Sequence, residues 1–360
     1  MFYRQLLWII LSSLLWVACS TPKLVNHTAH RNQIVVGAGP EDMELVTVNE
    51  QSHLLVSCLE RRSKGYEGDF WLIDLATDKP RRVERRGEPM GLIFRPHGLS
   101  TIKNDTGSFD VYVIHHGQHG DGNVGEGIYG HAILVYEWKD GFLHYKRAYY
   151  DSLLVNPNDL FVLENGSFYV TNAYFNPPVG FCQLLGICER STVVYFNNEK
   201  WSKVAEGLEY ANGVHYLPQS KEILISTSVS GNVWSYKRNV KTGGLSEKRL
   251  LFDNINSGDN FSYYDKDTLL LTSHANGTKF TLHAISPRVS SPTIVWRIHW
   301  REKRIDPIYY NKGGDSINGG STAILHNNKL YISQVFAPFI EVVDLRHRDF
   351  STSYQERRSN

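Results

Sequence analysis

The amino-acid sequence predicts an all-β protein, specifically a six-bladed β-propeller with a central tunnel. Three observations support this prediction. Short apolar runs follow one another along the 360-residue chain and are separated by Gly, Asn and Asp. No amphipathic helix of ordinary length interrupts them. A short polar motif recurs at intervals of 47 to 61 residues, as expected if each blade contributes one such motif.

The predicted strands are rich in Val, Ile, Leu and aromatic residues, which suit a pleated sheet. Their number and the chain length favour a propeller over a sandwich or a barrel. In chain order they span residues 53–60, 69–75, 110–116, 132–138, 160–163, 167–172, 192–198, 222–229, 232–238, 268–274, 281–286, 293–300, 329–335 and 339–345.

The N-terminus has the features of an export signal. Arg4 precedes an apolar stretch of 11 residues from Leu6 to Trp16, which is too short to span a bilayer as a helix of about 20 residues. The stretch ends in W-V-A-C-S, which resembles the lipobox of bacterial lipoproteins. We therefore predict an exported lipoprotein, anchored through a lipid on Cys19 to the periplasmic or cell-surface side of a membrane. Simple signal cleavage near Ala18 is the alternative.

These features predict four regions along the chain. They are a signal peptide (1–18), a lipidated tether (19–33), the propeller (34–348) and a polar C-terminal tail (349–360).

The nearly balanced charge narrows the range of binding partners. The chain has 38 basic and 37 acidic residues and a net charge of +1, so bulk electrostatics indicate no nucleic-acid partner.

In an oxidising compartment Cys182 and Cys188 could close a small disulfide loop, although the sequence leaves this open. Cys58 lies in an apolar run and is expected to be a core residue.

The recurring polar motif predicts a ring of oxygen ligands at one end of the tunnel. The motif is centred on Glu41, His97, Asn158, Asn212, Asp259 and Gly320. The side chains that offer oxygen donors are Glu41, Asn158, Asn212, Asp259 and Asn260. Calcium prefers such a set, whereas zinc prefers imidazole or thiolate. Asp42 and Asp159 directly follow two of these residues and could hold a second ion. The alternative is that each Asn or Asp simply makes a turn.

Several histidines are candidates for acid–base chemistry. His97 lies between Pro96 and Gly98, while His115 and His116 end a predicted strand. Two histidines within reach of each other can act as a base and its orienting partner. His274, in the sequence S-H-A-N-G, is a further candidate for the rim of a pocket.

These motifs together resemble the serum paraoxonase/arylesterase family, over roughly residues 35–345. They occur in the order P-E-D-M-E-L, R-P-H-G-L-S-T, V-Y-V-I-H-H, L-V-N-P-N-D-L, A-N-G-V, G-D-N-F, S-H-A-N-G and G-G-S-T-A-I. Members of that family are calcium-dependent six-bladed propellers that hydrolyse lactones and aryl esters. The family's disulfide between its first and last strands has no matching cysteine pair here, so closure is expected to rest on strand pairing alone.

The resemblance implies two calcium ions and assigns their ligands. The catalytic ion would be held by Glu41, Asn158, Asn212, Asp259 and Asn260. The structural ion would be held by Asp42, Asp159 and the backbone carbonyl of Leu99. His97 and His116 would form a dyad that activates water, and His274 would line the pocket. The calcium ion would polarise the carbonyl of a small lactone or ester substrate.

Two other functions remain open at this stage. One is a non-catalytic propeller that binds a ligand or partner and keeps calcium for structure, since a fold does not establish chemistry. The other is a sugar lactonase of the gluconolactonase type, against which the H-G-L-S and H-H motifs count.

Overall fold

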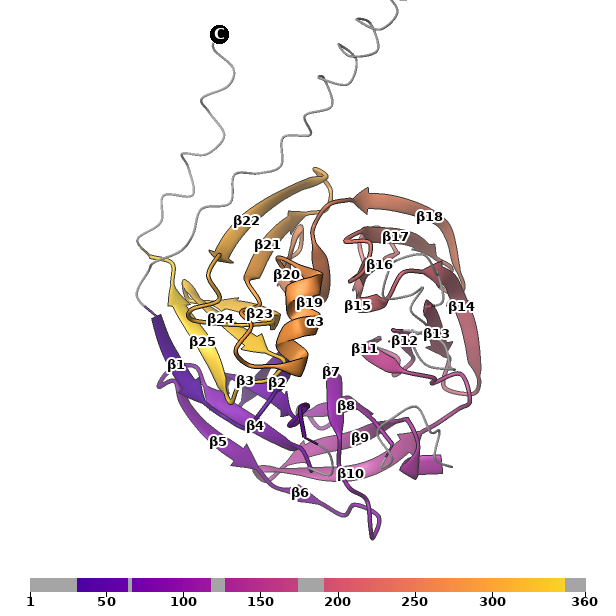
Figure 1. Ribbon diagram of the computed structural model, residues 1–360. Coiled ribbons are helices and arrows are strands. Elements are labelled where there is room, and N and C mark those ends of the chain that lie inside the picture. The colour runs from indigo at the N-terminus through magenta and orange to yellow at the C-terminus, as the bar shows by residue number, and fades with distance from the viewer. Residues whose placement is uncertain (1–30, 64–66, 118–126, 174–190, 347–360) are drawn as a thin grey trace, which may run out of the picture.

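The computed structural model describes residues 31–63, 67–117, 127–173 and 191–346. Six separate sheets stand around a common axis like the blades of a propeller (Figure 1). The predicted six-bladed β-propeller is therefore confirmed.

Blades 1 to 3 come from the N-terminal half of the chain. Blade 1 contains β2 (Pro40–Val48), β3 (Gln51–Cys58), β4 (Asp69–Asp74) and β5 (Lys79–Val83). Blade 2 contains β6 (Arg85–Arg86), β7 (Pro96–Lys103), β8 (Phe109–His115), β9 (Ala132–Lys139) and β10 (Phe142–Tyr149), with the short 3-10 helix η1 (Gly127–Tyr129) before β9. Blade 3 contains β11 (Pro157–Val162), β12 (Phe168–Asn172), β13 (Ser191–Phe196) and β14 (Trp201–Leu208).

Blades 4 to 6 come from the C-terminal half, with one strand from the N-terminus. Blade 4 contains β15 (Ala211–Leu217), β16 (Glu222–Thr227), β17 (Val233–Arg238) and β18 (Leu245–Phe252). Blade 5 contains β19 (Ser257–Asp265), β20 (Thr268–His274), β21 (Thr293–His299) and β22 (Arg304–Asn311), and the helix α3 (Gly277–Ile285) follows β20. Blade 6 contains β23 (Gly320–His326), β24 (Lys329–Gln334), β25 (Phe339–Asp344) and β1 (Arg31–Val35).

Blade 6 closes the ring by joining the two ends of the chain. β1 pairs antiparallel with β25, so that Arg31 lies opposite Val343 and Val35 lies opposite Phe339. Closure by strand pairing, as expected, is therefore confirmed. Because β1 begins at Arg31, residues 31–33 belong to this sheet rather than to the predicted tether.

The core is divided into six apolar clusters, one between each pair of neighbouring blades. Between blades 1 and 2, for example, Leu55 and Phe70 pack with Val111 and Leu134. A middle strand is therefore buried on both faces, and its sequence is a continuous apolar run rather than an alternating one. Cys58 belongs to one of these clusters and is a buried free thiol, as predicted.

One predicted strand is wrong. Residues 281–286 were expected to form a strand, but they belong mostly to the nine-residue helix α3. Asn276 caps this helix, because its side chain accepts a hydrogen bond from the backbone amide of Lys279 at 2.8 Å. Within the part of the chain that the structure describes, no helix has the length and hydropathy needed to cross a membrane.

Candidate metal centre and histidine pair

The polar motifs lie at the start of the innermost strand of every blade. Glu41 is on β2, His97 on β7, Asn158 on β11, Asn212 on β15, Asp259 and Asn260 on β19, and Gly320 on β23. These six strands contact one another in sequence around the axis. The residues therefore meet at one end of the tunnel, where the spacing of the motifs predicted them.

A β-bulge aims these side chains. The pairing of each inner strand with its neighbour shifts register at the motif, for example between Pro40 and Asp42 and between Gly320 and Ala323. The glycine that follows two of the polar residues is needed for close approach. A Cβ atom on Gly98 would lie 2.7 Å from the carbonyl oxygen of Asn158, and one on Gly213 would lie 2.5 Å from that of Asp259.

Buried hydroxyl groups hold the backbone of the ring in place. In four blades a side chain on the second strand donates to the carbonyl oxygen of the polar residue in the next blade. These bonds run from Ser57 to His97 at 2.6 Å, from Thr171 to Asn212 at 2.5 Å, from Ser226 to Asp259 at 2.6 Å and from Ser333 to Glu41 at 2.9 Å. The sequence interpretation missed these residues, although each lies directly after a run of apolar residues in its strand.

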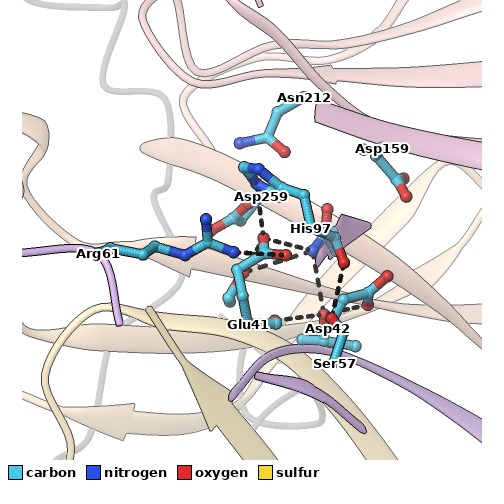
Figure 2. Close-up of polar contacts among 12 residues, drawn as sticks. Glu41, Asp42, Ser57, Arg61, His97, Asp159, Asn212 and Asp259 are labelled. Carbon is cyan, nitrogen blue, oxygen red and sulfur yellow. Dashed lines mark hydrogen bonds and ion pairs between the residues drawn. The ribbon is translucent and has the colours of Figure 1, made fainter. Parts of the chain in front are cut away.

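Glu41 is the centre of the polar ring (Figure 2). Its Oε1 atom accepts hydrogen bonds from Ser321 at 2.9 Å and from the side-chain amide of Asn260 at 3.2 Å. His97 Nε2 lies 3.5 Å from the same oxygen. Burial tends to raise the pKa of Glu41, but His97 and Arg61 outweigh it and hold the pKa at about 2. Glu41 is therefore a carboxylate at every physiological pH.

Among the residues that the structure describes, four buried oxygen atoms of the ring have no hydrogen-bond donor. They are Glu41 Oε2 and the Oδ1 atoms of Asn158, Asn212 and Asn260. All four residues are less than 9% exposed. A buried oxygen without a donor is costly, so such a set indicates a missing positive partner. The four atoms are amide and carboxylate oxygens, which calcium accepts as ligands. The residues present therefore fit that ion.

Asp259 and His274 form a buried pair beside this ring. Asp259 Oδ2 lies 3.2 Å from His274 Nε2, and the His274 ring stacks on Phe280 of α3 with centroids 3.7 Å apart. His274 was expected at a pocket rim, but only 3% of its surface is exposed. No group of three or more His, Cys, Asp or Glu residues forms a metal site among the described residues, and asparagines supply three of the five predicted ligands of the catalytic ion.

Asp42 and Asp159 lie one step further along the inner strands. Burial raises the pKa of Asp42 to about 7, with the neighbouring charge of Glu41 as a second cause. Burial, and then Asp42, also raise the pKa of Asp159. Backbone amides of the adjacent blades donate to both: Leu99 to Asp42 at 2.7 Å and Val214 to Asp159 at 2.8 Å. A shared cation would stabilise both groups as carboxylates, and a second ion at this pair stays a prediction.

The histidine pair is assembled as the resemblance implied. His97 Nδ1 lies 2.6 Å from His116 Nε2, and His116 Nδ1 lies 3.3 Å from His131 Nδ1. His115 does not belong to this series of contacting histidines, since its Nδ1 accepts a hydrogen bond from the Arg95 backbone amide at 3.1 Å. Burial, followed by the charges of His97 and His131, holds the pKa of His116 well below its ordinary value.

Some predicted features cannot be placed. Cys19 and the proposed disulfide between Cys182 and Cys188 lie outside the described residues.

The tunnel beyond Asp42 and Asp159 widens into a cavity of about 280 Å³, lined by the far halves of the inner strands and by Trp300. This cavity lies at the opposite end of the inner strands from His97.

His215 in the wall of that cavity gives a pH prediction. Its ring lies between Phe161 and Phe261, and burial lowers its pKa from 6.5 to about 4. The unfolded chain therefore binds a proton that the folded state rejects, so stability is full above pH 6.5 and falls as the pH drops towards 4. We expect this loss in the free energy of unfolding to be on the order of 3 kcal/mol. The His215→Phe variant should lose less stability over the same pH range. Urea unfolding at pH 4.5 and 7.5 measures the difference, with His53→Phe as the control; equal pH dependence in both variants would contradict the assignment.

A comparison with known protein families and proteins gives three further findings. A family model described as Arylesterase matches residues 43–342. Serum paraoxonase/arylesterase 2 from Gallus gallus is 28% identical over 277 residues, which is 75% of this chain and 75% of that protein. More than one protein of this description is similar to the chain at comparable coverage.

Solved structures share the fold at low sequence identity. A luciferin-regenerating enzyme superposes with a TM-score of 0.55 at 12% identity and covers 87% of this chain and 95% of its own. Regucalcin from Agrobacterium tumefaciens, described as a calcium-binding protein, superposes with a TM-score of 0.52 at 11% identity and covers 87% of this chain and 91% of its own. These similarities concern the propeller architecture alone.

Proposed function

Because this chain belongs to the arylesterase family, we propose that it is a calcium-dependent hydrolase of lactones, aryl esters or both. The observation that carries the proposal is the group of four buried oxygens without donors, which lies beside a pair of hydrogen-bonded histidines. The family supports hydrolysis of an ester or lactone bond. Calcium dependence and the substrate class are our inference from the residues.

The residues assigned to the ions follow from their donor atoms. Glu41, Asn158, Asn212, Asp259 and Asn260 would hold the catalytic ion, and Asp42, Asp159 and the carbonyl of Leu99 would hold the second ion. Bound calcium would supply Lewis-acid polarisation of the substrate carbonyl and stabilise the negative charge that develops on its oxygen. The description of a related propeller, regucalcin, as a calcium-binding protein is consistent with this choice of ion.

His97 is the proposed general base. Since His116 stays neutral, its Nε2 can accept a hydrogen bond from the N–H of His97 Nδ1 across the 2.6 Å contact, and His97 keeps that proton. His97 Nε2 is then free to take a proton from an attacking water. The carboxylate of Glu41, 3.5 Å from that nitrogen, stabilises the imidazolium that results. His274 would orient Asp259 rather than contact the substrate, because it is buried between Asp259 and Phe280.

We also propose that the protein is exported and anchored by a lipid on Cys19. The support is the sequence alone: a single arginine, a short apolar stretch and the W-V-A-C-S motif. Metabolic labelling with a palmitate analogue, compared between the wild type and Cys19→Ala, tests this anchor.

The direct test is hydrolysis with and without metal. We expect the protein to hydrolyse δ-valerolactone, a long-chain acyl lactone or phenyl acetate when calcium is present. Hydrolysis should stop in excess chelator and return when calcium is restored. Magnesium should not restore activity, since it requires a smaller octahedral site. If calcium raises the melting temperature but no substrate is cleaved, the protein is a binding propeller with structural calcium.

A further inference from the structure

Arg61 brings a positive charge to the edge of the polar ring. It lies in the loop after β3 and points towards Glu41 (Figure 2). Its Nη2 atom lies 3.8 Å from Glu41 Oε2, which is beyond hydrogen-bond length. The contact is therefore an electrostatic attraction without the paired N–H···O bonds that arginine usually makes with a carboxylate.

The guanidinium of Arg61 has donors that nothing in the described structure satisfies. Its Nε and Nη2 atoms are both buried and have no hydrogen-bond partner, and only 14% of the side chain is exposed. A guanidinium carries five N–H donors in a fixed planar arrangement and does not lose its charge. Leaving such donors buried and unpaired is unfavourable, so the site requires an explanation.

The adjacent arginine shows the difference. Arg62 donates to His283 Nε2 at 3.0 Å and to the His283 carbonyl at 2.9 Å, and its guanidinium lies 4.0 Å above the Phe336 ring. Arg62 is therefore held by α3 and its surroundings. Among the described residues, no group accepts a hydrogen bond from Arg61 Nε or Nη2, so these donors are available to a bound ligand.

The charges around Arg61 favour a single negative group. Burial lowers its pKa, Glu41 and Asp259 act in the opposite direction, and the charge of Arg95 lowers it again. Arg95 also has a buried Nε atom without a partner. The Arg61 guanidinium is therefore influenced by two carboxylates that are already assigned to metal binding and by a second guanidinium. A monoanion would satisfy the spare donors, whereas a dianion would be repelled by Glu41 and Asp259.

Arg61 also lies where a substrate would pass. His97 and Arg61 approach Glu41 to 3.5 Å and 3.8 Å. Their side chains keep 16% and 14% exposure, while Glu41 keeps 3%. A molecule that reaches His97 from solvent therefore comes within reach of Arg61.

We propose that Arg61 binds a carboxylate group carried by the substrate, so that the preferred substrates are lactones or esters with a negatively charged substituent. This inference rests on the proposed function and refines its substrate class. Two carboxylate oxygens match the planar N–H groups of a guanidinium, which makes carboxylate the natural monoanion.

The experiment compares two lactones that differ only in charge. One is γ-butyrolactone bearing a carboxylate on the γ carbon, and the other bears a carboxamide there. We expect the wild type to favour the carboxylate in kcat/KM by about tenfold to a hundredfold, mainly through KM, because hydrogen bonds to charged groups are strong. Arg61→Gln should abolish the preference and Arg61→Lys should keep part of it. Arg82→Gln, at an exposed arginine, is the matched control and should keep the preference.

A second readout separates this inference from the proposed function. Binding of tetrahydrofuran-2-carboxylate, an unreactive monoanion with the shape of the charged lactone, to the calcium-loaded protein is measured by calorimetry in the wild type and in Arg61→Gln. Equal hydrolysis of the two lactones by the wild type would overturn the role of Arg61 and leave the proposed function standing. If neither lactone is cleaved, the proposed function fails. Binding of tetrahydrofuran-2-carboxylate that weakens in Arg61→Gln would then still support anion recognition, and unchanged binding would reject it.

Discussion

Replacing Glu41 with Gln is expected to cause the largest loss of any single substitution at the polar ring. Glu41 is ionised, buried and hydrogen-bonded through Oε1, while Oε2 has no donor. Gln preserves the size of the side chain but removes the charge that a calcium ion would neutralise. Removing one partner of a buried charged pair costs on the order of 3–5 kcal/mol, which corresponds to roughly two to four orders of magnitude in the calcium Kd.

Calcium titration by calorimetry measures this effect directly, and lactone hydrolysis at fixed calcium measures its consequence. The matched control is Glu341→Gln, which removes another fully buried carboxylate, on β25 and 3.9 Å from Arg31. We expect Glu341→Gln to lower the melting temperature without changing the calcium Kd. A normal calcium Kd in Glu41→Gln would show that Glu41 is not a ligand and would remove the basis for the catalytic ion.

The sequence predicted some strands much better than others, and burial explains the difference. Middle strands such as β8 and β20 are buried on both faces, so they appear as apolar runs and were found. Outer strands such as β5 and β18 are largely exposed and carry several charged residues, so they were missed. Inner strands were largely missed as strands, because each begins with a bulge and a polar motif instead of an alternating pattern.

The ring of polar residues was nevertheless located correctly, because its spacing follows the blade repeat. The groups that support it were not located. Ser57 and Thr171 act through the carbonyl oxygens of residues in the next blade, and a hydroxyl in a strand sequence does not show which backbone carbonyl it will bind. Arg61 was missed for the same reason, since it lies in a loop and its charge is informative only beside Glu41. Helix α3 was mistaken for a strand because Phe280, Leu282 and Ala284 alternate with polar residues, which is the pattern of a strand.

Replacing His97 with Gln is expected to lower kcat by about a hundredfold or more while leaving calcium binding intact, since general-base catalysis contributes on that scale. Gln cannot take up a proton, although it can still accept hydrogen bonds. The backbone of the ring should be preserved, because Ser57 binds the carbonyl oxygen of residue 97 and not its side chain. The loss should be smaller than in Glu41→Gln, because the calcium ligands are intact and bound calcium would still supply polarisation of the substrate carbonyl.

The pH profile distinguishes a base from a structural residue. A general base acts only in its unprotonated form, so the wild-type kcat should rise with pH. His116 should remain neutral throughout, because burial holds its pKa well below the ordinary value. In His97→Gln this rise should disappear, so that the remaining rate is flat between pH 5.5 and 8. His116→Gln should retain a rise of reduced amplitude, since it removes only the acceptor 2.6 Å from His97. A His97→Gln variant that keeps both the wild-type kcat and its pH dependence would mean that water is activated without the histidine pair.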